Sequence, residues 1–272
     1  QLREIGLALQ NYHSTHEHFP TGRSRSAQYG GSWAFHILPQ LEQQSIHDAH
    51  VPTERVDSPA NAAAMRTPIA VYACPSRRPP AADRDFDNDD EPSLVQGAAV
   101  LGDYAANAGL EEDIGMEGND FYNGGVDLTL AGPIFSGSKI AARQVTDGLS
   151  NTLAIGERHL PPARDDWEPG RIHARQGDTC FLAGDDVNTI FRGAEEGLAE
   201  GINDRERDVF GSAHPDITLF VFLDGHVEAL SSQSRGGATG VNPHDVQDIR
   251  MEEEWLWLYA LSTVSGAEVV HN

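Results

Sequence analysis

The N-terminal segment carries the pattern that most constrains how this chain folds. Apolar side chains recur there at steps of three and four, which predicts a helix with one apolar side: Leu2, Ile5, Leu9 and Tyr12. Leu7 and Ala8 widen that side, and Pro20 with Gly22 ends the helix near His18. Such a helix buries its stripe against a second layer, and no N-cap residue precedes Leu2. We therefore expect residues 1–19 to be the C-terminal half of a longer helix that lies on a sheet.

The rest of the chain alternates short strand and helix patterns with loops. The clearest is a hairpin over 217–230, where an apolar run turns at Asp224 and Gly225. Residues 151–157 and 69–74 predict buried strands, and 97–109 a short strand with a turn. Residues 32–49, 61–66 and 246–261 predict short helices. We expect one α+β domain over 1–272, with the polar segment 160–208 as a variable insertion of surface loops.

The charge of the chain limits the kinds of molecule that it can bind. The net charge is −23, from 42 acidic and 19 basic residues. This charge opposes binding to phosphate backbones, so we expect no nucleic-acid partner. It fits either a solvated surface in salty surroundings or the binding of divalent cations. No apolar run approaches the ~20 residues that span a bilayer, and no signal peptide is visible.

Two cysteines, Cys74 and Cys180, make up the thiol content. Neither belongs to a Cys-x-x-Cys pair, which argues against a zinc site built from cysteines. In an oxidising compartment they can pair and close a long loop. Otherwise they are two separate buried thiols, and the sequence leaves both alternatives open.

An acidic loop is the candidate calcium site. Asp85, Asp87 and Asp89 alternate along it, an arrangement that gathers hard oxygen ligands for Ca²⁺. The EF-hand pattern fails, because its glycine position is Asp90 and its bidentate glutamate position is Gln96. The alternative is a solvated acidic loop without an ion.

The end of the predicted helix carries candidate ligands of another kind. His13 and His16 lie on one helix face, as a transition-metal pair does. The alternative is a helix end whose histidines complement the helix dipole.

Polar residues also mark the predicted turn and strand over 147–157. Asp147 and Asn151 flank the turn, where short polar side chains most often accept backbone amides. Glu157 ends a predicted buried strand, and a buried carboxylate needs a partner. Arg143 and Arg158 are the candidate partners, and a ligand or metal site is the alternative.

His214 and Asp224 stand nine residues apart, around the first hairpin strand. At a rise of ~3.3 Å per residue they lie far from each other and form no dyad. Asp224 and Gly225 therefore make the turn, and His214 stands at the strand entry, within reach of another loop.

Motifs that mark an enzyme are missing from the sequence. It contains no Gly-x-Ser-x-Gly elbow, no P-loop and no His-Glu-x-x-His pair. We therefore expect a non-enzymatic protein. The four tryptophans fit core and helix packing, apart from Trp167, which lies in the exposed segment DDWEPG and can stack on a sugar.

Several of these segments together resemble one bacterial family of unknown function, which is expanded in planctomycetes and was formerly labelled solute-binding. Its members begin with a prepilin-type cleavage and methylation segment and end with a His-x9-Asp-Gly motif. The resemblance is collinear over nearly the whole chain. It departs at Asp216 and Ile217, where the family usually has small residues, often two glycines. Matching positions are His13, His16, Cys74, Asp147, Asn151, Glu157, His214, Asp224 and Gly225.

The resemblance implies a pilin-like fold, in which the N-terminal helix packs on an antiparallel sheet with long loop insertions. It implies an extracytoplasmic protein that a preceding transmembrane segment anchors in the inner membrane. Its expected partners are other pilin-like subunits or the machinery of a type II secretion or type IV pilus-like assembly. The alternative is a binding module for a carbohydrate or other small solute, built on the loops of 160–208.

Overall fold

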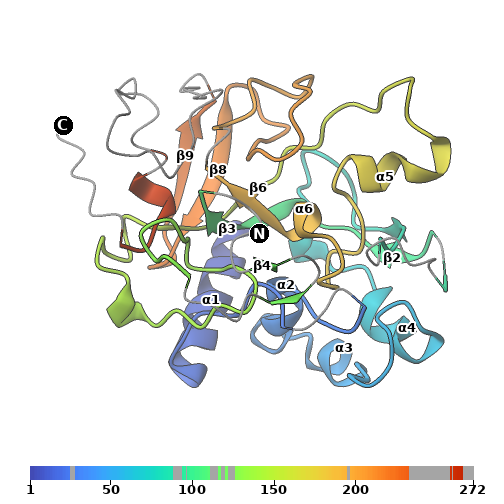
Figure 1. Cartoon of the computed structure of the whole chain (residues 1–272), viewed down its shortest axis with the longest axis horizontal. Helices are drawn as coiled ribbons and strands as arrows, with labels where there is room; N and C mark the ends of the chain where they lie inside the picture. Colours follow the sequence, from blue (N-terminus) through green and yellow to red (C-terminus); the bar gives the residue numbers. More distant parts are fainter. Residues whose placement is uncertain are drawn as a thin grey trace.

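The computed structural model shows an α+β fold, with an N-terminal helix and a central sheet (Figure 1). It describes residues 1–24, 28–87, 94–95, 97–110, 116–117, 120–121, 126–194, 197–232, 258 and 260–265. The predicted helix over 246–261 lies mostly outside these residues. None of the helices in the described ranges combines the length and the apolar character needed to cross a membrane.

The first helix, α1 (Leu2–His16), confirms the N-terminal pattern. All four stripe residues are buried in the core: Leu2, Ile5, Leu9 and Tyr12. The prediction was wrong for Leu7, which is 62% exposed because it lies on the opposite face. The helix ends two residues before His18, where Glu17 takes a left-handed backbone with φ of 63° and donates its N–H to the carbonyl of His13.

The central sheet has five strands in the order β7-β3-β6-β8-β9. They are β3 (Tyr104–Gly109), β6 (Leu153–Glu157), β7 (Phe191–Gly193), β8 (Ile217–Phe222) and β9 (Val227–Ser231). The expected antiparallel pairing holds for every neighbouring pair except β3 and β7, which run parallel. This exception follows from the chain order, because β6 runs antiparallel to β3 and the long segment after β6 turns the chain back into the direction of β3 before β7.

The hairpin of β8 and β9 forms as the sequence predicts, with Gly225 at φ of 90° in its turn. Helix α1 packs directly on this hairpin. A Cβ built at Gly6 would lie 2.6 Å from a methyl carbon of Val221 and 3.1 Å from the carbonyl oxygen of Gly225. The absence of a side chain at Gly6 therefore sets how closely α1 approaches the sheet.

Short helices gather beside α1 in the lower part of the view in Figure 1. They are α2 (Trp33–His36), η1 (Leu38–Leu41), α3 (Gln44–Asp48), η2 (Pro59–Asn61), α4 (Ala62–Met65) and η3 (Ala70–Tyr72). Two of them, η1 and η3, contact α1 next to the hairpin. Ser32 caps α2, because its hydroxyl oxygen accepts the N–H of Phe35. The strand predicted over 69–74 is wrong, because that apolar run forms the 3₁₀ turn η3, of which only Tyr72 is buried.

Segment 160–208 is only partly a set of surface loops. Its first half carries η6 (Pro169–Arg171) and α5 (Ile172–Arg175), where no side chain is buried. Its second half enters the core through α6 (Val187–Ile190), β7 and the fully buried side chains of Cys180, Phe181 and Leu182. The prediction missed this half because a short apolar run stands among many polar residues.

The remaining elements lie outside the main sheet. They are β1 (Ala82–Arg84), β2 (Ala99–Val100), β4 (Met116–Glu117), β5 (Asp120–Phe121) and η5 (Ala142–Gln144). Strands β1 and β2 pair antiparallel with each other, as do β4 and β5.

Two of the leucines of α1, Leu9 and Leu7, provide a direct test of its packing. We expect Leu9→Ala to lower the free energy of unfolding by about 2–5 kcal/mol, because it empties a buried position. The matched control, Leu7→Ala, changes it by less than about 0.5 kcal/mol. Denaturant unfolding measures both, and equal losses would contradict the packing of α1 on the hairpin.

Candidate functional site

Three positions of the sequence motifs meet at one end of the sheet: Cys74, Glu157 and His214. The Sγ of Cys74 lies 3.4 Å from Oε1 of Glu157 and 4.0 Å from Nε2 of His214. Nε2 of His214 lies 3.4 Å from the same Oε1. A thiol, a carboxylate and an imidazole thus face one another, with all three ligand atoms within 4.8 Å.

Each side chain of this cluster is held by the local backbone. Glu157 is the last residue of β6, and its Oε2 accepts the N–H of Leu219 from the neighbouring β8 at 2.9 Å. Cys74 follows η3, and its N–H donates to Oδ2 of Asp103 at 2.8 Å. The N–H of His214 donates to the hydroxyl of Ser212 at 2.8 Å. These contacts leave Oε1, Sγ and Nε2 directed at one another.

The backbone after His214 takes an unusual path into β8. Asp216 has φ of 58°, in the left-handed region that favours glycine. Its carbonyl accepts the N–H of Ser232 at 2.9 Å, which closes the far end of the hairpin. This turn places His214 beside Glu157 rather than along the strand.

Burial shapes the chemistry of the cluster. It raises the pKa of Glu157, although the Leu219 N–H, the charge of His214 and the Cys74 thiol oppose the rise. Burial also raises the pKa of Cys74, and the nearby Glu157 carboxylate raises it further. A nucleophilic cysteine typically has a lowered pKa, and the shift of the Cys74 pKa runs in the other direction. The donor set is instead suited to holding a cation or to bonding the three segments together.

The sequence named the wrong partners for Glu157. Arg143 is exposed on η5, and Arg158 points into a separate buried network of charges. Neighbouring residues of an extended chain face opposite sides, so Glu157 and Arg158 do not meet across the strand. The carboxylate is satisfied by the Leu219 N–H together with the thiol and the imidazole.

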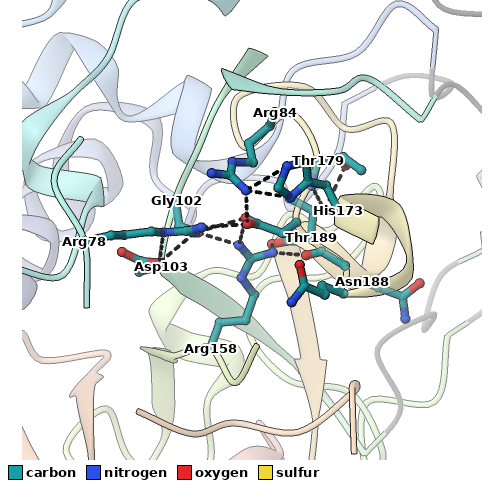
Figure 2. Close-up of polar contacts among 12 residues, drawn as sticks. Arg78, Arg84, Gly102, Asp103, Arg158, His173, Thr179, Asn188 and Thr189 are labelled. Atoms are coloured by element: carbon teal, nitrogen blue, oxygen red, sulfur yellow. Dashed lines mark hydrogen bonds and ion pairs between the residues drawn. The ribbon is translucent and has the colours of Figure 1, made fainter. Parts of the chain in front are cut away.

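The network behind Arg158 centres on Asp178. Figure 2 shows Arg78, Arg84 and Arg158 converging on one point. Oδ2 of Asp178 lies 2.6 Å from a guanidinium nitrogen of Arg78 and 3.1 Å from one of Arg84, and Oδ1 lies 2.8 Å from one of Arg158. Arg78 also pairs with Asp103 at 2.8 Å, which connects the network to the backbone of Cys74.

The charges of this network hold each other ionised. Burial alone would raise the pKa of Asp178, but Arg78, Arg158 and Arg84 outweigh it and hold that pKa well below its usual range. Burial lowers the pKa of Arg158 to about 10, so its guanidinium stays charged at neutral pH. Removing one partner of such a set leaves an uncompensated buried charge.

The other turn motifs gather at the opposite end of β6 and β8. The side-chain amide of Asn151 donates to the carbonyl of Asp147 at 3.0 Å, so it is a donor there and not the expected acceptor. Oδ1 of Asp224 accepts the N–H of His226 at 3.0 Å, next to Gly225 in the turn. As predicted, His214 and Asp224 lie at opposite ends of β8 and form no dyad.

The helix-end histidines have separate partners. Nε2 of His13 accepts the N–H of Ala142 at 3.2 Å, and its ring lies 4.6 Å from that of Phe19. The ring of His16 stacks on Tyr12 at 4.0 Å. These contacts give both residues a packing role.

The acidic loop is described only in part, because Asp89 lies outside the described residues. Oδ1 of Asp85 accepts the N–H of Gly97 at 2.6 Å. Asp87 pairs with Arg171 at 3.4 Å and donates its N–H to Asp185 at 2.9 Å. Calcium binding at this loop stays a prediction.

The two cysteines do not form the disulfide that the sequence allowed. Both are free and buried, in different surroundings. Cys74 faces the cluster of Glu157 and His214, whereas Sγ of Cys180 lies 3.8 Å from the carbonyl oxygen of Met65.

The fold and the cluster define an α+β protein whose amphipathic helix lies on a sheet that carries a buried thiol–carboxylate–imidazole group. A family model described as a protein of unknown function (DUF1559), with the short name SBP_bac_10, matches residues 1–235. The chain belongs to this family. Among curated proteins and among solved structures, the comparisons return no match.

Asp178 gives a test of the buried network. We expect Asp178→Asn to lower the free energy of unfolding by about 3–5 kcal/mol, because Arg158 stays buried without its counter-charge. The matched control is Asp166→Asn, in an exposed pair with Arg164 at 3.1 Å, which changes it by less than about 0.5 kcal/mol. Chemical denaturation compares them, and a neutral Asp178→Asn would contradict a charged network.

Proposed function

We propose that this chain is the extracytoplasmic head of a membrane-anchored, pilin-like subunit without enzymatic activity. The observation that carries the proposal is the packing of α1. Its apolar face, including Leu9 and Ile5, is fully buried on the hairpin and the short helices, while the opposite face stays open. A helix held in this way continues naturally into an upstream membrane segment.

The open face of α1 supports a role in assembly. Leu7 is 62% exposed on a face whose other members are polar, among them Arg3, Glu4, Asn11 and Ser14. A lone exposed leucine is ordinary on a monomer. On the helix that would lead to a membrane anchor, the same leucine would lie where neighbouring subunits of a type II secretion or pilus-like assembly pack. The occupants we propose for this face are other pilin-like subunits.

The test uses the full-length gene product in its own envelope. We expect it in the membrane fraction, and we expect Leu7→Cys to give disulfide-linked multimers under mild oxidation. The control is Ile202→Cys, which is equally exposed at 60% but lies on a loop far along the chain. The native thiols are buried and do not interfere. A full-length protein in the soluble fraction, or equal cross-linking of both variants, would contradict the proposal.

A second candidate function is the binding of a small solute. A hollow of about 430 Å³ supports it. Its lining mixes polar and apolar surface and comes from two loops: Pro162, Ala163, Arg164, Asp165, Asp166, Asn203 and Arg205. Trp167, which the sequence offered for sugar stacking, is half-buried and does not line it.

A thermal-shift screen with neutral and carboxylated sugars tests this candidate. We expect a saturable rise of Tm that Arg205→Ala abolishes, because a ligand in the hollow loses its cationic contact. Arg175→Ala, on α5 and outside the hollow, keeps the rise. Absence of any shift with the wild type leaves the anchored head as the single proposal.

A further inference from the structure

We propose that Cys74, Glu157 and His214 form a binding site for a divalent transition metal, with Zn²⁺ as its ion. The site lies at one end of the central sheet. The proposal does not depend on whether a membrane segment anchors the protein. The three residues come from segments far apart in the chain: the loop after η3, the end of β6 and the loop before β8.

Two of the three donor-atom separations match those of a tetrahedral metal site. A tetrahedral Zn²⁺, bonded at about 2.3 Å to sulfur and about 2.0–2.2 Å to nitrogen and oxygen, separates its ligand atoms by about 3.4–3.6 Å. The distances from Oε1 of Glu157 to Sγ of Cys74 and to Nε2 of His214 are both 3.4 Å, while Sγ and Nε2 lie 4.0 Å apart and would close slightly around an ion. Hydrogen bonds from nitrogen to oxygen are shorter, about 2.7–3.2 Å, so the gap between His214 and Glu157 exceeds a normal contact.

The types of the donors select the ion. Sulfur and imidazole nitrogen suit zinc and related transition metals, whereas Ca²⁺ and Mg²⁺ require oxygen ligands. The three protein donors leave a fourth tetrahedral position for water or an exogenous ligand. His214 provides the access, because its side chain is 27% exposed while that of Glu157 is 3% exposed.

The surroundings orient the ligands as they do in known metal sites. Oε2 of Glu157 is already engaged by the N–H of Leu219, so Oε1 alone faces the site. Asp103 fixes the backbone of Cys74 and also pairs with Arg77 at 3.3 Å. That pair offsets the positive charge of Arg77 near the cation. Such outer contacts fix ligand geometry and contribute to metal affinity.

Metal titration of the chelator-treated protein tests the proposal. We expect calorimetry to show uptake of one Zn²⁺ per chain, with a rise of Tm. We expect Co²⁺ to give the near-ultraviolet charge-transfer band of a thiolate ligand. Cys74→Ser removes that band, and His214→Ala and Glu157→Gln weaken binding by more than about tenfold, since even outer-shell losses cost about 10–100-fold.

The matched control is His226→Ala. His226 is another histidine beside acids, with Nδ1 2.6 Å from Asp224 and Nε2 3.8 Å from Glu228, and its loss leaves the binding unchanged. Circular dichroism checks that each metal-free variant is folded. If Cys74→Ser fails to fold, the metal affinity of His214→Ala tests the proposal instead. The side chain of His214 is partly exposed, so we expect this variant to fold. No uptake by the wild type, or uptake that His214→Ala leaves unchanged, overturns the proposal.

Discussion

Two consecutive residues at the end of strand β6, Glu157 and Arg158, carry opposite charges, and both side chains are buried. The surrounding loops supply their partners. Because the two side chains face opposite sides of the chain, neither neutralises the other. Glu157 takes its partners from Leu219 and the residues of the cluster, and Arg158 takes Asp178. An unpaired buried charge costs several kcal/mol, so both contacts fix segments that have little regular structure of their own.

Elements with a local periodic signal could be predicted from the sequence. The stripe of α1 repeats at helical spacing, and burial of Leu9 and Tyr12 follows from that spacing alone. The hairpin of β8 and β9 is similarly local, because Asp224 and Gly225 set the turn between two strands. The strand β6 was recognisable as a short apolar run, and its register against β3 and β8 came only with the structure.

Contacts between distant segments could not be predicted in this way. Each member of the cluster was singled out alone, yet 83 residues separate Cys74 from Glu157, and no periodicity relates them. The buried role of Asp178 had no signal in the sequence, because its partners Arg78 and Arg158 lie 100 and 20 residues away along the chain. The run before Cys74 was mistaken for a strand because a short apolar segment fits a buried turn equally well.

The left-handed backbone of Asp216 sets the path by which the chain enters β8. At that φ an L-residue bears roughly 1–2 kcal/mol of steric cost, which is smaller for Asp than for most residues and absent for glycine. The hairpin hydrogen bond of Ser232 depends on that conformation, so the path is kept despite the cost. The left-handed backbone at position 216 thus limits which residues can replace Asp216. Glycine, asparagine and aspartate tolerate this conformation, whereas β-branched residues do not.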